Sequence, residues 1–134
     1  MKAAVLKKLI EAKFSIFLVI GVFGLALNLS TFAVYINFFS PTVSSFLAFS
    51  TAVIFNYLCH GRFLWKFNYE EIFLPKRFIK FYLGYSFSMI INISIVYFFQ
   101  DSLEEIILVQ LIGVVLGSLL NFFVSKLSFI GSFK

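Results

Sequence analysis

The sequence predicts an all-α integral membrane protein with four transmembrane helices, built from two helical hairpins of the same topology. Apolar residues make up 61% of the 134 positions and charged residues only 13%, with a mean hydropathy of +1.01. A water-soluble domain of this length needs far more polar surface. The apolar residues form four runs, each with the roughly 20 residues that cross a hydrocarbon core. The second pair of runs also repeats the polar pattern of the first.

Short polar connections separate the four predicted spans. In order, the spans cover Phe14 to about Phe38, about Val43 to Leu64, Phe78 to about Phe99, and about Ile106 to Phe129. Before the first span, Met1 to Lys13 has the pattern of an amphipathic helix on the membrane surface.

The connections differ in chemistry. The first contains Ser40 and Pro41, which suit the N-cap and the first position of a helix. The middle loop, Trp65 to Lys76, is polar and basic, whereas the turn from Gln100 to Glu105 is acidic.

Positive charge lies on one side of the predicted membrane. All eleven Lys and Arg lie before the first span, around the connection between the second and third spans, or at the end of the chain. The positive-inside rule therefore predicts that both termini and the middle loop are cytoplasmic, in a multi-pass protein of the cell membrane.

The two halves align with each other. Asn28 and Asn92 are 64 positions apart, as are Phe17 and Phe81, and Gly24 and Ser88. One extra residue in the second outer turn gives a separation of 65, which pairs Ala48, Ala52 and Asn56 with Gly113, Gly117 and Asn121. We therefore expect one domain over residues 1–134, with a first repeat at about 13–67 and a second at about 77–130. Small residues on one helix face let backbones approach closely in lipid.

The intramembrane asparagines fall at two depths. From a helical rise of roughly 1.5 Å per residue, Asn56 and Asn121 lie about 8–9 Å inside the cytoplasmic edge, and Asn28 and Asn92 about 22 Å inside. Such amides either join neighbouring helices, at about 1 kcal/mol each, or mark a polar path for a substrate. Gln110, Ser50, Thr51, Ser88 and Ser118 would extend that path. The sequence leaves both readings open.

The charge pattern and residue types exclude several function classes. No Asp or Glu lies within the predicted spans, so the chain lacks the membrane-embedded carboxylate of a proton-coupled exporter. His60 is the sole histidine and is expected near the headgroups, and no metal-ligand cluster or nucleophile–base pair is evident. We therefore expect no enzymatic activity, no cofactor and no nucleic-acid partner.

Basic residues at the cytoplasmic ends of the spans are candidates for binding a lipid phosphate. Arg62 and Lys126 follow Asn56 and Asn121 closely, and Lys13 and Arg77 begin the first and third spans. A guanidinium or ammonium beside amide donors suits a phosphate. The simpler reading is that these charges set topology and attract anionic lipid.

Two segments carry a family resemblance. NYLCHGRFLW (Asn56 to Trp65) and NFFVSKLSFI (Asn121 to Ile130) resemble the paired N-[FY]-x-x-[NS]-[RK]-x-aromatic motifs of the GtrA-like family. The resemblance covers nearly the whole chain, Lys13 to Phe129. His60-Gly61 departs from the motif in the first copy, and Ser128 replaces the usual aromatic residue in the second.

The resemblance implies a four-helix membrane protein of cell-surface polysaccharide or teichoic-acid glycosylation. It favours a flippase-like transporter that moves a polyprenyl-phosphate-linked monosaccharide, such as undecaprenyl-phosphate-glucose, from the cytoplasmic to the outer leaflet. The expected substrate-binding residues are Asn28, Asn56, Arg62, Asn92, Asn121, Lys126, Lys13 and Arg77. The alternatives are a non-transporting scaffold for a membrane glycosyltransferase and a small-solute pore. Four helices make a thin wall for a polar path, so we also expect a homodimer.

Overall fold

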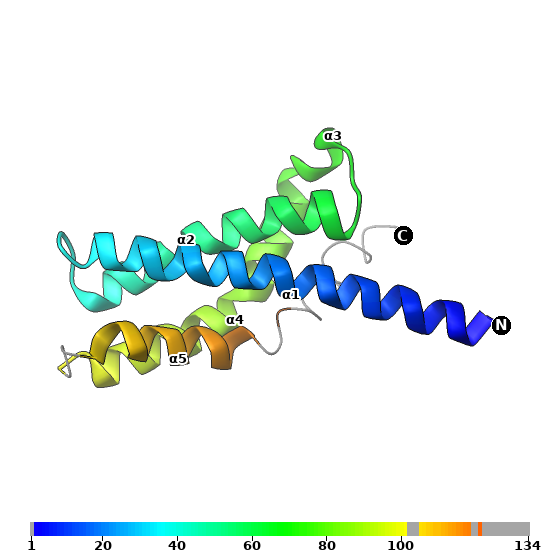
Figure 1. The fold of residues 1–134 in the computed structure, drawn as a ribbon. Coiled ribbons are helices and arrows are strands. Elements are labelled where there is room, and N and C mark those ends of the chain that lie inside the picture. Colours follow the sequence, from blue (N-terminus) through cyan, green and yellow to red (C-terminus); the bar gives the residue numbers. More distant parts are fainter. Residues whose placement is uncertain (1, 102–104, 119–120, 122–134) are drawn as a thin grey trace.

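The computed structural model describes the backbone of residues 2–10, and both backbone and side chains of residues 11–101, 105–118 and 121. Every regular element in these residues is a helix (Figure 1). They are α1 (Lys2–Tyr35), α2 (Pro41–Cys59), the π-helix His60–Leu64, α3 (Tyr69–Ile72), α4 (Pro75–Phe99) and α5 (Ile106–Ser118). The predicted all-α fold is confirmed for the described part of the chain.

Three described stretches are long and apolar enough to cross a membrane. They are Glu11–Tyr35, Pro41–Leu64 and Pro75–Phe99, of 24 or 25 residues each. α5 has 13 residues and begins at the predicted start of the fourth span. Apart from Asn121, the rest of that span lies outside the described residues.

The N-terminal segment differs from the prediction. Lys2 to Tyr35 form one uninterrupted helix of 34 residues, rather than a surface helix followed by a span. No Pro or Gly lies near Lys13 and Phe14 to break the backbone hydrogen bonds, so the helix continues through the charged boundary. The prediction of a separate surface helix is wrong.

The start of α2 is confirmed. Ser40 has extended backbone angles, and its Oγ accepts a hydrogen bond of 3.4 Å from the Val43 N–H. Pro41 opens the helix, where its missing N–H would have had no partner within the helix. The chain therefore reverses sharply after α1.

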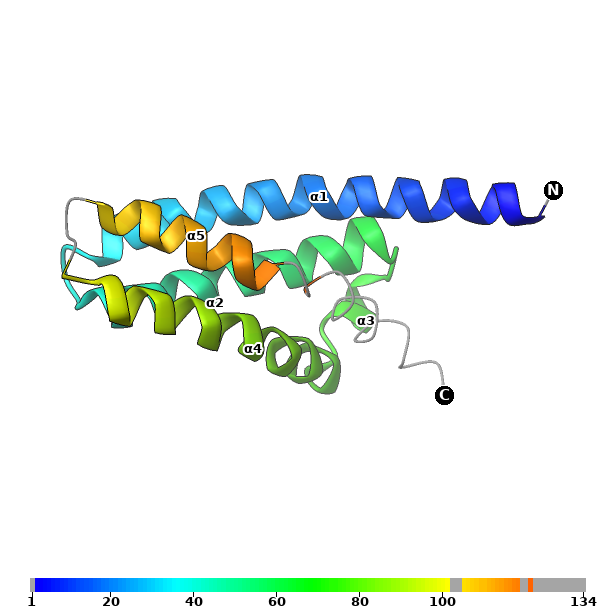
Figure 2. The same cartoon turned by 90° about the horizontal axis from the view of Figure 1, so that it is seen from below.

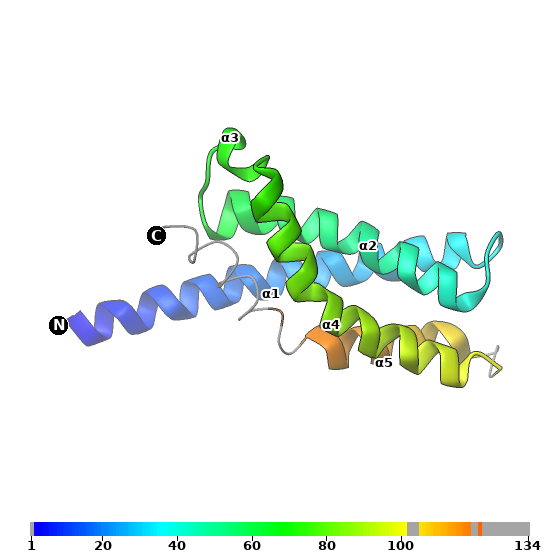
Figure 3. The same cartoon turned by 180° about the vertical axis from the view of Figure 1, so that it is seen from behind.

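The helices form two hairpins, α1 with α2 and α4 with α5. The turn between α1 and α2 lies at one end of the molecule, beside the last residues of α4 and the first residues of α5 (Figures 1 and 2). The N-terminus and α3 lie at the opposite end. Seen from behind, α4 runs obliquely from α3 to the end where it pairs with α5 (Figure 3). Both hairpins therefore enter from the same side.

The core lies mainly between α2 and α4. Near α3 it is aromatic, and its buried members are Phe49, Val53, Tyr57, Phe67, Ile72, Phe81 and Tyr85. The Tyr57 hydroxyl donates to the Ile72 carbonyl, which ties α3 to α2. At the end of the molecule opposite α3, the Thr42 hydroxyl donates to Gln100 Oε1 over 3.3 Å. This bond links the start of α2 to the end of α4.

Candidate functional site

Four buried polar side chains join α1, α2, α4 and α5 at the level of Asn28 and Asn92. The Gln110 Nε2 donates to Asn28 Oδ1 over 2.8 Å, and the Asn92 Nδ2 donates to Ser45 Oγ over 2.8 Å. The Ser45 hydroxyl donates to Gln110 Oε1 over 2.9 Å, which connects the two pairs. None of the four side chains is more than 1% exposed. These amides therefore join neighbouring helices, which is one of the two roles that the sequence left open for them.

The two pairs occupy positions that the predicted repeat makes equivalent. Asn28 corresponds to Asn92, and Ser45 corresponds to Gln110, 65 positions later. Each asparagine on the first helix of a hairpin bonds a polar residue on the second helix of the other hairpin. The polar network therefore holds the hairpins to each other.

The inner asparagines differ from one another. The Ser88 hydroxyl lies 2.8 Å from Asn121 Oδ1 and also within hydrogen-bonding reach of the Gly117 carbonyl, so one proton serves two acceptors. Asn56 faces Gly24 instead, at the position equivalent to Ser88. The Asn56 Oδ1 is buried and has no hydrogen-bond partner among the described residues. The second repeat pairs its amide where the first does not.

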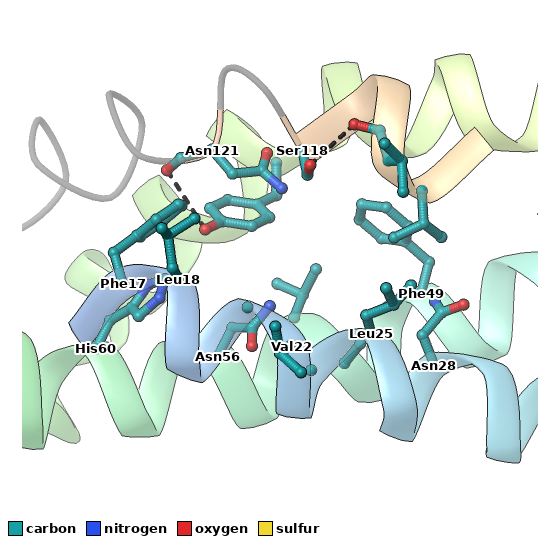
Figure 4. Close-up of a pocket in the computed structure, with 17 residues that line it drawn as sticks. Phe17, Leu18, Val22, Leu25, Asn28, Phe49, Asn56, His60, Ser118 and Asn121 are labelled. Carbon is teal, nitrogen blue, oxygen red and sulfur yellow. Dashed lines mark hydrogen bonds between the residues drawn. The ribbon is translucent and has the colours of Figure 1, made fainter. Parts of the chain in front are cut away.

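A pocket of about 210 Å³ lies between the hairpins, with walls from α1, α2, α4 and α5. Phe17 and His60 lie at one end and Asn28 lies at the other, with Asn56 between them (Figure 4). Most of the lining is apolar, and its polar members are Asn28, Asn56, His60, Tyr85, Ser118 and Asn121. From Phe17 to Asn28 the pocket follows α1 for about 16 Å. It therefore connects the inner and outer polar depths, whereas Asn92 is enclosed within the network.

His60 lies inside the protein and not among headgroups as expected. It is 1% exposed, and its ring stacks on Phe17 with centroids 5.1 Å apart and meets Phe81 at 5.9 Å. It opens the π-helix at the end of α2, whose wider turn changes which side chains face inward. The hydropathy of the segment contains no signal for this turn.

Arg77 has a structural environment. It is 8% exposed, its Nη1 donates to the Glu71 carbonyl over 2.9 Å, and its guanidinium lies 4.2 Å from the centre of the Phe67 ring. Glu71 belongs to α3, whose first turn is closed by reciprocal bonds between Asn68 and Glu71. Arg77 therefore fastens the middle loop to the start of α4.

Lys13 and Arg62 lie against aromatic rings of the middle loop. The Lys13 Nζ is 4.5 Å from the centre of the Trp65 ring, and the exposed Arg62 guanidinium is 5.4 Å from that of Tyr69. Arg62 belongs to the π-helix that begins at His60, and Trp65 follows that helix directly. Both basic residues therefore lie toward the His60 end of the pocket. Lys126, the remaining basic candidate, lies outside the described residues.

Two residues of the network and the pocket were not among the candidates predicted from the sequence. Ser45 connects the outer network, and Gly21 lines the pocket. Alignment of the two repeats could have identified both residues. Ser45 aligns with the polar Gln110, and Gly21 stands where the second repeat has the large Tyr85. In the described part of the chain, no three His, Cys, Asp or Glu side chains lie together as a metal site would require.

Comparison with known proteins gives one match. The family model described as the GtrA/DPMS transmembrane domain matches residues 16–129. No curated protein matches the chain. No solved structure matches it either.

Proposed function

The chain belongs to the GtrA/DPMS transmembrane-domain family, and from this membership we propose that it is a flippase-like transporter of lipid-linked sugar. Its substrate would be a polyprenyl-phosphate monosaccharide, such as undecaprenyl-phosphate-glucose. It would move this lipid from the cytoplasmic to the outer leaflet for glycosylation of cell-surface polysaccharide. The family match supports a membrane protein of lipid-linked sugar handling, and the transport step is our proposal.

The observation that carries the proposal is the pocket between the hairpins. Its walls are mainly apolar, yet they hold two carboxamide atoms without a hydrogen-bond partner among the described residues, Asn56 Oδ1 and Asn28 Nδ2. One is an acceptor and the other a donor. A buried amide without partners is costly in a low-dielectric setting, so a hydroxyl-bearing guest gains by pairing with it. An apolar pocket with a few polar groups is typical of a ligand site.

The surroundings of the pocket suit the other two parts of such a lipid. Lys13 and Arg62 lie at the His60 end, where a phosphate would meet cations. Val19, Val22 and Phe23 are 57–65% exposed on α1, where a polyprenyl tail would stay in lipid. Arg77 and Asn92 are assigned to structure in this proposal, because the loop and the outer network already engage them.

The positive-inside rule supports the direction of transport. With the N-terminus and α3 in the cytoplasm, the Lys13 and Arg62 end of the pocket would receive substrate from the cytoplasmic leaflet. The concentration gradient of the lipid-linked sugar would drive the movement.

Reconstitution tests the proposal. Purified protein is placed in proteoliposomes with a short-chain fluorescent polyprenyl-phosphate-glucose in one leaflet, and an impermeant enzyme or quencher reports the exposed fraction over time. Protein-dependent equilibration between leaflets is the expected result. Binding without any change of sidedness would overturn transport and favour the scaffold for a membrane glycosyltransferase.

A further inference from the structure

The two repeats differ at two positions that border the inner asparagines. In α4, the second repeat has Tyr85 and Ser88, and the equivalent positions of α1 are Gly21 and Gly24. The Tyr85 ring stacks on Phe81 with centroids 4.4 Å apart, and its hydroxyl donates to the Asn121 carbonyl over 3.4 Å. The Ser88 hydroxyl bonds the Asn121 side chain, so Asn121 is held at both its side chain and its backbone carbonyl.

The first repeat lacks both contacts. A Cβ at Gly21 would meet no atom within 4 Å, so the space that Tyr85 fills in the second repeat is open in the first. A Cβ at Gly24 would lie 2.3 Å from Asn56 Oδ1, so the amide occupies the room that a side chain would take. Both glycines line the pocket. The open space of the pocket at Gly21 therefore lies where the second repeat has the Tyr85 side chain, and the room at Gly24 is taken by the Asn56 amide.

We infer that only the first repeat recognises the sugar. The Asn56 carboxamide is its hydrogen-bonding group, and Gly24 leaves this amide without a partner in the protein, so that it can bind a sugar hydroxyl. The inference rests on the proposed function and adds the group that distinguishes a hydroxyl-bearing lipid from a bare polyprenyl phosphate. Asn121, the equivalent amide, is engaged by Ser88 and serves packing.

The Asn56 side chain can adjust to a guest. Its oxygen faces Gly24, and among the described residues no hydrogen bond holds the carboxamide in that orientation. The terminal torsion of asparagine has a broad energy profile, so the amide can turn its oxygen or nitrogen toward the pocket. A sugar hydroxyl both donates and accepts, and it therefore pairs with either end of the amide.

The test copies the second repeat into the first. The variant Gly24→Ser supplies the hydroxyl that Ser88 supplies to Asn121, with Ala52 at the position where the second repeat has Gly117. In nanodiscs, the wild type is expected to bind short-chain polyprenyl-phosphate-glucose more tightly than the same polyprenyl phosphate without sugar. Gly24→Ser should reduce this preference about tenfold, the equivalent of one hydrogen bond. Affinity for the bare phosphate is measured in parallel, so that the preference is a ratio of two affinities of the same variant.

Three further variants control for folding and bulk. Ala26→Ser adds a hydroxyl to an exposed position of α1 outside the pocket, and it should keep the preference. Gly24→Ala displaces Asn56 without offering a partner, so its melting temperature should fall below that of Gly24→Ser. If Gly24→Ser does not fold, Asn56→Leu, which keeps the approximate shape and removes the amide, should lose the preference instead.

The outcomes separate this inference from the proposed function. A folded Gly24→Ser or Asn56→Leu protein that keeps the wild-type preference overturns the inference, even if the lipid is still transported. A wild type that lacks any preference for the glycosylated lipid also overturns it. A preference that depends on Gly24 and Asn56, without movement between leaflets, supports the inference and overturns the transporter.

Discussion

Asn28 on α1 and Gln110 on α5, 82 positions apart in the chain, are joined by a 2.8 Å hydrogen bond from Gln110 Nε2 to Asn28 Oδ1. Gln110 also accepts from Ser45 on α2, while Asn92 on α4 donates to Ser45. One fully buried side chain thus links the two hairpins through both of its amide atoms.

Gln110→Leu should destabilise the protein by about 1–3 kcal/mol, because it leaves Asn28 and Ser45 buried without this partner. Thermal unfolding in detergent measures the effect. Leu108→Ile changes a 52% exposed residue on the same helix and should change the melting temperature little. Equal effects of the two changes would mean that the network does not hold the hairpins together.

Gly117→Leu should prevent stable folding. A Cβ at Gly117 would already lie 2.9 Å from the Ser88 carbonyl oxygen, and this backbone atom cannot move without shifting α4. The fraction of monodisperse protein after extraction is the readout. Leu116→Ile, at a 52% exposed neighbour, is the control, and comparable losses from both would remove the special status of the small-residue face.

The inner asparagines should respond differently to the same substitution. Asn121→Leu removes one of the two acceptors of the Ser88 hydroxyl, so it should lower the melting temperature more than Asn56→Leu, which breaks no described hydrogen bond. Asn56→Leu should have the larger effect on lipid-sugar binding, measured per folded protein. The reverse ranking would assign packing to Asn56 and recognition to Asn121.

The two arginines should separate stability from binding. Arg77→Gln should destabilise the protein by about 1–3 kcal/mol, because Arg77 contacts Phe67 and bonds the Glu71 carbonyl in a buried setting. Arg62→Gln should leave stability unchanged and weaken binding of polyprenyl phosphate, since its guanidinium is exposed. Lys66→Gln removes the same charge from an exposed loop position. Equal binding by the Arg62 and Lys66 variants would show that Arg62 acts only as a topology signal.

Cysteine accessibility should test the orientation. In a Cys59→Ala background, Phe38→Cys at the α1–α2 turn should react with an impermeant maleimide outside intact cells, and Glu70→Cys in α3 should react only after permeabilisation. Both positions are exposed on the protein, so burial does not limit labelling. The opposite pattern would reverse the proposed direction of transport.

Much of the architecture was readable from the sequence. Hydropathy located the three described spans and the start of α5, and the Ser40-Pro41 pair located the start of α2 within the chain. Spacing identified the asparagines at two depths, and the comparison of halves identified the positions that turn out to make paired interactions. These properties depend on neighbours along one helix, and helical periodicity makes them visible without the fold.

Tertiary structure decided which hydrogen-bond partners each polar side chain has in the described part of the chain. The sequence presented Asn28, Asn56, Asn92 and Asn121 as equivalent candidates, but the docking of the hairpins encloses Asn92 and pairs Asn121, while Asn56 faces Gly24. It also brought Arg77 onto Phe67 and turned His60 inward through a π-helix. A hydrogen bond between two helices forms only when their rotation and separation bring donor and acceptor atoms to the right distance, within a few tenths of an ångström. Those distances are set by packing of side chains far apart in the chain, so no local pattern contains them.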